Sequence, residues 1–132
     1  MRAGAAIVAE ADQVGGTRLP VLRSAPPLSL RAGGGQGWAG RALSLSAAEP
    51  PNHEQGARPR AVTVWMVGTA AGPLSGDRVG LGVEVGAGAS VTVRSTAASI
   101  VLGGPSEDDS ELVVDVDVGP GGELCWLPEP TV

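Results

Sequence analysis

The chain has 132 residues, a formal net charge of −5, 21 glycines and 11 prolines, and it contains neither Phe nor Tyr. Its basic residues are scattered arginines with no basic stripe and no interleaved aromatics, which gives no support for nucleic-acid binding. A single cysteine excludes an internal disulfide, and no apolar run approaches the ~20 residues of a membrane span. We therefore expect a cytoplasmic protein with no membrane association.

The first third of the chain predicts three short strands. Weak alternation at residues 5–9 and 19–22 flanks residues 14–17, Val-Gly-Gly-Thr, which read as a hairpin turn because glycine supplies a positive φ. Pro20 places the second strand at a sheet edge, since proline cannot donate to a ladder on both sides. Residues 28–30 form a third candidate strand.

Residues 32–60 carry no strand pattern. They are glycine-rich, then polar, then interrupted by prolines, which is typical of a long flexible loop or an insertion. Residues 39–48 are compatible with a marginal helical turn.

The second half predicts five strands from the alternation of apolar residues. They fall at residues 62–67, 79–85, 91–94, 112–118 and 124–126. The side chains expected in the strand core are Val83, Val85, Val91, Val93, Val116, Val118 and Trp126.

An internal repeat links the last four of these strands. Residues 83–93 (VEVGAGASVTV) match residues 116–126 (VDVGPGGELCW) at a constant offset of 33 residues, with glycine on glycine at the turn. Each copy reads as strand, turn, strand, and the structural turn glycines include Gly86 and Gly88. The sequence predicts an all-β fold with few or no α-helices. Its antiparallel strands are expected to stack in layers, as in a β-helix or a β-sandwich. Residues 1–132 are expected to be a single and incomplete domain.

The stretch AAGPLSGDR at residues 70–78 is a candidate site that fails each catalytic test. A phosphate loop needs a lysine where Asp77 stands, and a nucleophile elbow needs a serine spaced by one residue from each glycine, whereas Ser75 adjoins Gly76. A turn remains, preset by Pro73 and relaxed by Gly72 and Gly76.

No metal site emerges from the ligand pattern. Cys125 and His53 stand alone in dissimilar contexts and cannot make a closed zinc site. The acidic residues 107–109 with Glu111 indicate a solvated turn. Asp115 and Asp117 share one strand face, as on an ordinary exposed strand, so no tightly bound cofactor or metal is expected.

Five pieces of the sequence, in order, resemble the urease accessory protein family UreD, also called UreH. They are a first hairpin at residues 9–31, the turn at 71–77, the strand and GAGA turn at 83–89, the strand at 91–98, and WLPEPTV at 126–132.

The resemblance implies a scaffold and chaperone rather than an enzyme. Members of this family resemble a layered all-β stack that binds a UreF partner, which recruits a UreG GTPase, on the urease apoprotein during nickel insertion. Nickel is thought to pass through a tunnel with an acidic and polar lining. Asp77 is the acid that carries over, and Glu129 lies one position from the family's acid. Both are candidates for transient Ni²⁺ contact or for facing a partner.

Two other functions remain open from the residues alone. One is a small β-sandwich interaction module with no metal role. The other is a hydrolase that uses Ser75 or Asp77, which would need a base that the sequence does not visibly provide.

Overall fold

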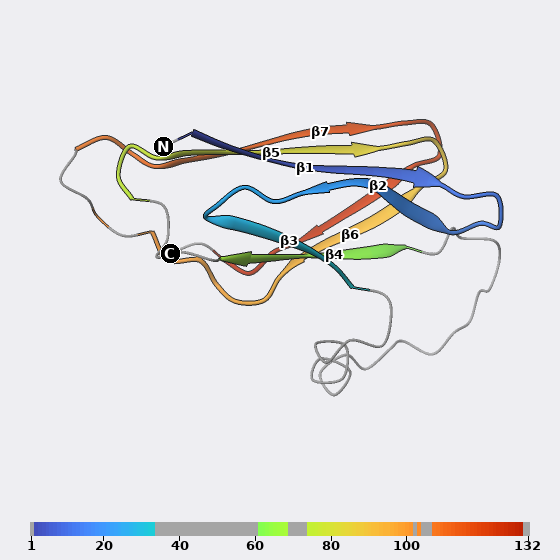
Figure 1. The fold of residues 1–132 in the computed structure, drawn as a ribbon, viewed down its shortest axis with the longest axis horizontal. Helices are drawn as coiled ribbons and strands as arrows, with labels where there is room; N and C mark the ends of the chain where they lie inside the picture. Colours follow the sequence, from blue (N-terminus) through green and yellow to red (C-terminus); the bar gives the residue numbers. More distant parts are fainter. Residues whose placement is uncertain (1, 34–60, 69–73, 102, 104–106, 131–132) are drawn as a thin grey trace.

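A computed structural model of the chain describes residues 2–33, 61–68, 74–101, 103 and 107–130 (Figure 1). These residues fold into two four-stranded sheets and contain no helix, which confirms the all-β prediction. Within them no helix is long and apolar enough to cross a membrane. Most of the predicted loop, residues 34–60, lies outside the described residues, as does the helical turn expected at 39–48. Ala32 and Gly33, which were assigned to that loop, belong instead to a strand.

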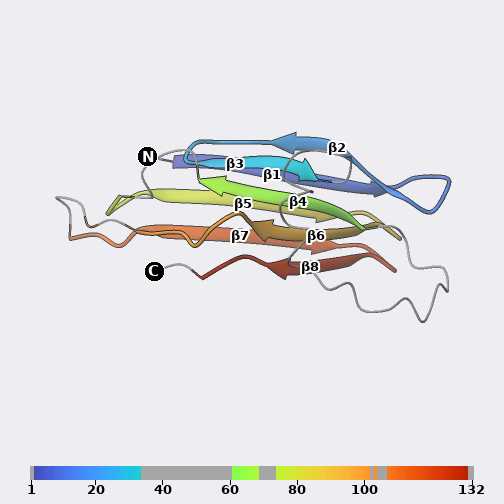
Figure 2. The same cartoon turned by 90° about the horizontal axis from the view of Figure 1, so that it is seen from below.

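The two sheets face each other, and we call them sheet A and sheet B. Sheet A contains, in spatial order, β2 (Thr17–Arg23), β1 (Arg2–Ala11), β5 (Arg78–Val85) and β7 (Glu111–Val118). Sheet B contains β3 (Leu28–Gly33), β4 (Val62–Gly68), β6 (Ser90–Ser95) and β8 (Glu123–Leu127). In Figure 2 the strands appear as stacked rows that end with β8. The edge position predicted for the second strand is confirmed by β2.

The pairing between layers is parallel, which corrects the expectation of antiparallel layers. Only β1–β2 and β3–β4 pair antiparallel, whereas β1–β5, β5–β7, β4–β6 and β6–β8 all pair in parallel. The reason is that the chain crosses from sheet A to sheet B and back in each layer. It therefore re-enters the same sheet in the same direction.

The 33-residue repeat in the sequence corresponds to the register in which strands of successive layers pair. Val83 of β5 pairs with Val116 of β7, and Val93 of β6 pairs with Trp126 of β8, both at the offset of 33 residues. One sequence repeat is thus one layer: a strand of sheet A, a corner and a strand of sheet B.

Glycines allow the corners to stack closely. The turns at residues 86–89 and 119–122 each close with a hydrogen bond, from the Ala89 N–H to the Gly86 carbonyl (3.1 Å) and from the Gly122 N–H to the Gly119 carbonyl (2.9 Å). Gly88 and Gly121 have φ of 70° and 67°, which suits glycine in the third position of a type II turn. The Gly88 N–H also donates to the Pro120 carbonyl (3.1 Å), so the backbone ladder continues around the corner.

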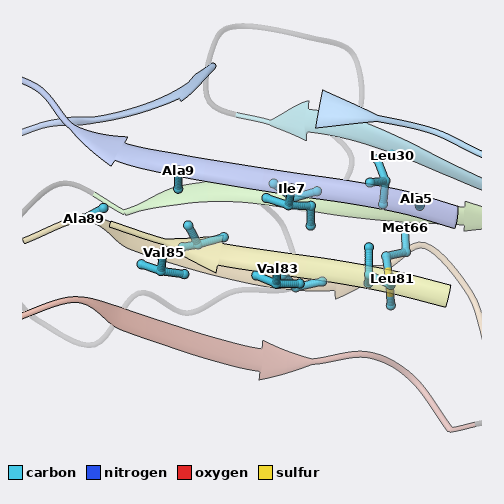
Figure 3. Close-up of a cluster of buried hydrophobic side chains, with 12 residues drawn as sticks. Ala5, Ile7, Ala9, Leu30, Met66, Leu81, Val83, Val85 and Ala89 are labelled. Atoms are coloured by element: carbon cyan, nitrogen blue, oxygen red, sulfur yellow. The ribbon is translucent and has the colours of Figure 1, made fainter. Parts of the chain in front are cut away.

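The core lies between the sheets and is built from small aliphatic side chains (Figure 3). Val83, Val85, Val91 and Val93 are buried there, together with Ile7, Leu81 and Val64 on neighbouring strands. Trp126 is partly buried and packs against this cluster.

Val116 and Val118 are not in the core, contrary to expectation. They pair with the buried Val83 and Val85, yet they remain 49% and 41% exposed. The strand that carries them, β7, is the last in the order of sheet A, so no further described strand packs beside it.

Candidate functional site

A cavity of about 980 Å³ opens between the sheets at the end of the strands opposite the glycine corners. Apolar side chains dominate its lining and come from both sheets, and one wall is the segment that follows β6. The residues that define it best are Leu28, Met66, Val79, Ile100, Val114 and Trp126. Its concave and largely apolar lining is typical of a site that binds a ligand or a partner.

Two carboxylates reach the rim of the cavity, from Glu111 and Glu129. The Glu129 backbone N–H donates to the Ser95 Oγ at 2.7 Å, which fixes the chain after β8 against the end of β6. Glu111 begins β7 and forms an ion pair with Arg78, with 3.2 Å between Arg78 Nε and Glu111 Oε2. Both side chains of that pair are more than half exposed, so the pair adds little to the stability of the fold. It holds the Glu111 side chain against the start of β5.

Asp77 closes a tight turn just before β5. Its N–H donates to the Leu74 carbonyl (2.9 Å), and the Leu74 N–H donates back to Asp77 Oδ2 (3.1 Å). Gly76, with φ of 81°, occupies the position in this turn where a left-handed backbone is needed. Of the predicted turn glycines, Gly76 and Gly88 adopt positive φ, Gly86 serves close packing at the corner, and Gly72 lies outside the described residues.

The pKa of the Asp77 carboxyl lies below its ordinary value of 3.8. The first cause is a hydrogen bond with the chain's amino terminus, and the second is the bond from the Leu74 N–H. Both favour the charged form, so Asp77 is a carboxylate at neutral pH.

The structure places Asp77 beside the cavity but not in its lining. The Glu111 N–H donates to the Asp77 carbonyl at 2.8 Å, which ties the turn to the start of β7. Glu129 lines the cavity directly. The two predicted acids therefore belong to one end of the molecule, and Glu111, which bonds to the Asp77 backbone and lines the same cavity as Glu129, is a third acid there.

Sequence reasoning missed the part that Glu111 and Ser95 play at this site. Glu111 was read as part of a solvated acidic turn, because its neighbours 107–109 are also acidic. The signal that would have identified it is the repeat itself, since residue 111 lies 33 positions after Arg78 and pairs with it across the strands.

No metal-ligating cluster assembles among the residues that the structure describes. No three His, Cys, Asp or Glu side chains there lie close enough together to hold an ion. Asp115 and Asp117 are exposed on the outer face of sheet A, and the free Cys125 is partly buried on β8. Ser75 lies in the turn before Asp77, and His53 is outside the described part of the chain.

These features define a class: a layered all-β protein whose repeated two-strand layers stack in parallel register around an aliphatic core. The sequence matches the family described as UreD urease accessory protein over residues 7–132, and the chain belongs to this family.

Named relatives agree with this assignment. The chain is 42% identical over 132 residues to a urease accessory protein UreD of Frankia casuarinae and 39% identical to one of a Parafrankia species. A UreD of Streptomyces avermitilis is 37% identical over 132 residues. Each alignment covers all of this chain but only 40%, 37% and 44% of these relatives, so the chain spans about two fifths of their length.

Proposed function

We propose that this chain forms the scaffold portion of a urease accessory protein that supports nickel insertion into the urease apoprotein. It acts by binding, in complex with UreF-like and UreG-like partners, and it catalyses no reaction. The observation that carries the proposal is the family match across residues 7–132, supported by the 33-residue layer register that the fold shares with the sequence.

Nickel is cargo in this proposal, not a resident cofactor. Carboxylate oxygens bind hard and borderline cations weakly unless several converge. Asp77, Glu111 and Glu129 lie near one end of the stack without converging, which favours transient contact over tight binding. The working compartment in this proposal is the cytoplasm.

A chimera tests the proposal. The matching segment of the Frankia casuarinae UreD would be replaced by this chain, and the chimera co-expressed with that organism's apourease and remaining accessory proteins. We expect urease activity and nickel content near those of the parent, together with recovery of a stoichiometric complex by affinity pull-down. Asp77→Ala and Glu129→Ala in the chimera should lower the rate of urease activation while leaving the complex intact.

One result would contradict the scaffold proposal, and a second would contradict only the contact of the two acids with nickel. A folded chimera that retains no urease component would favour the β-sandwich interaction module without a metal role. Normal activation by the Asp77→Ala, Glu129→Ala double variant would remove both acids from nickel transfer and leave scaffolding alone.

A further inference from the structure

Two arginines flank a tryptophan in one row across sheet B. Arg31 of β3 pairs with Trp65 of β4, and Trp65 pairs in turn with Arg94 of β6. Directly paired residues on neighbouring strands have Cβ atoms about 5 Å apart on the same face of the sheet. The order of these strands in the stack is visible in Figure 2.

The row lies on the outer face of sheet B, away from the core. On either side of Trp65, Val64 and Met66 are buried between the sheets, and Leu30 and Val93 are buried next to the two arginines. Since successive side chains of a strand point to opposite faces, the row points outward. Arg31 and Arg94 are exposed, and Trp65 is half-buried.

The indole of Trp65 is held against the sheet. A Cβ built on Gly33 would lie 2.5 Å from Trp65 Nε1 and 2.8 Å from Cδ1, so the ring occupies the space above this glycine. A large side chain that is already held in place loses little conformational freedom when a partner binds.

Among the residues that the structure describes, no carboxylate forms an ion pair with Arg31 or Arg94. The ion pairs within the described part of the chain are Arg18–Glu10 and Arg78–Glu111, and both lie in sheet A. The strands of sheet B contain one acidic residue, Glu123, which starts β8, whereas Arg94 pairs with Leu127 at its other end.

The outer face of sheet A differs, because it carries charges of both signs and its Arg18 and Arg78 are ion-paired with Glu10 and Glu111. On sheet A, Glu84 pairs with Asp117, and Asp115 lies two residues before Asp117; all three are exposed. Arg31 and Arg94 therefore form a small positive patch around Trp65, in a chain whose net charge is −5.

We infer that the outer face of sheet B, centred on Arg31, Trp65 and Arg94, docks an acidic segment of a partner protein. Guanidinium groups bind carboxylates through paired hydrogen bonds, and Trp and Arg are the residues that most often dominate the energy of protein interfaces. A carboxylate-bearing polypeptide fits better than a nucleic acid, because the net negative charge of the chain repels a polyanion of high charge density.

The test uses hexaglutamate as the probe and the full chain, labelled with ¹⁵N. Of the three tryptophan indole signals, that of Trp65 is identified by its loss in Trp65→Phe. We expect hexaglutamate at low ionic strength to shift the Trp65 signal in a saturable way, and hexaglutamine to leave it unchanged. Added salt should weaken the binding.

Matched variants localise the binding. Arg31→Gln with Arg94→Gln should weaken hexaglutamate binding about tenfold, as expected for the loss of two exposed charge pairs. Arg18→Gln with Arg23→Gln removes the same number of charges from the exposed edge strand β2 of sheet A and should leave the affinity unaltered. Circular dichroism verifies that each variant is folded.

Four results would overturn the inference. They are the absence of any hexaglutamate effect, equal affinity in the Arg31→Gln, Arg94→Gln variant, and tighter binding of an oligothymidylate than of hexaglutamate at the same sites. The fourth is occupation of the outer face of sheet B by this chain itself. A second copy on that face would cause self-association that the Arg31→Gln, Arg94→Gln variant abolishes. Residues 34–60 on that face would make their deletion shift the Trp65 signal. None of these measurements involves urease components, so the inference stands or falls separately from the proposed function.

Discussion

Individual side chains in this core carry much of its stability, because no Phe or Tyr is available to fill space. Leu81 is 1% exposed and sits among valines from both sheets, whereas Leu112, on the adjacent strand, is 55% exposed. Burial rather than residue type should therefore decide the cost of truncating either leucine.

We expect Leu81→Ala to lower the free energy of unfolding by about 3 kcal/mol, since it removes buried methyl groups and leaves a cavity. Leu112→Ala is the matched control and should cost about 1 kcal/mol or less. Urea denaturation followed by circular dichroism measures both. Equal losses in the two variants would mean that the cavity end of β7 is packed more tightly than its exposure indicates.

The turn at Asp77 should make stability depend on pH in acid. A carboxyl whose pKa is lowered on folding stabilises the fold above its unfolded pKa, and this contribution is lost as pH falls through the folded pKa. For Asp77 the loss begins near the ordinary value of 3.8 and continues below it. Asp77→Ala should thus be less stable than the parent at pH 7, with the difference shrinking toward pH 3. A difference that persists unchanged in acid would assign the effect to the turn backbone.

At the scale of the strands, the alternation of apolar residues was sufficient to predict where each strand lies and that the fold is all-β. It also identified the 33-residue repeat, because strands of equal length with equal corners leave a constant offset. It could not supply the direction of pairing, since the same alternation serves parallel and antiparallel neighbours.

The burial of particular residues depended on what lies beside the strand. Val116 and Val83 look alike in sequence, yet only Val83 has a described strand on both sides. The arginine–tryptophan row was likewise hidden, because β4 and β6 pair at an offset of 29 residues, from Trp65 to Arg94, rather than 33. The local sequence pattern indicates which face of a strand a side chain lies on. Which residues lie beside it on neighbouring strands follows only from the assembled sheet.

Corner packing gives a prediction at this same scale. A Cβ on Gly119 would lie 2.9 Å from the Ala87 backbone nitrogen of the corner in the preceding layer, so Gly119→Ala must push two turns apart. We expect a loss of about 2 kcal/mol in unfolding free energy. Gly82→Ala is the control: its Cβ would meet nothing within 4 Å, and in mid-strand it should gain about 0.5 kcal/mol. Thermal denaturation of the two variants side by side would reveal whether the corners or the strand interiors limit the stack.

For the molecule as a whole, four of the nine exposed large apolar side chains among the described residues lie on the last strand of each sheet. Leu112, Val116 and Val118 lie on β7, and Leu127 lies on β8. Exposed strand edges with apolar side chains promote association between molecules.

We expect Val116→Lys with Val118→Lys to reduce concentration-dependent association of this chain, because charges at a sheet edge oppose pairing with another edge. Size-exclusion chromatography with light scattering measures the change. Val14→Lys, at a 90% exposed position in the β1–β2 turn, is the control for added charge alone. Equal effects of the two changes would point to net charge, not to the β7 edge.

Because residues 33 positions apart pair in register, the stack can lose or gain a whole layer without exchanging its inner and outer faces. Removing residues 85–117 would join Glu84 directly to Val118. Val118 would then take the place of Val85, its partner in the neighbouring strand, so Glu84 would still point outward. The joined strand would keep the length of β5 and would lead into the corner at 119–122 with every remaining side chain on its original face. An insertion or deletion of one whole layer is therefore a single genetic step that preserves the inside and outside of the stack, whereas a change of one residue within a strand inverts them.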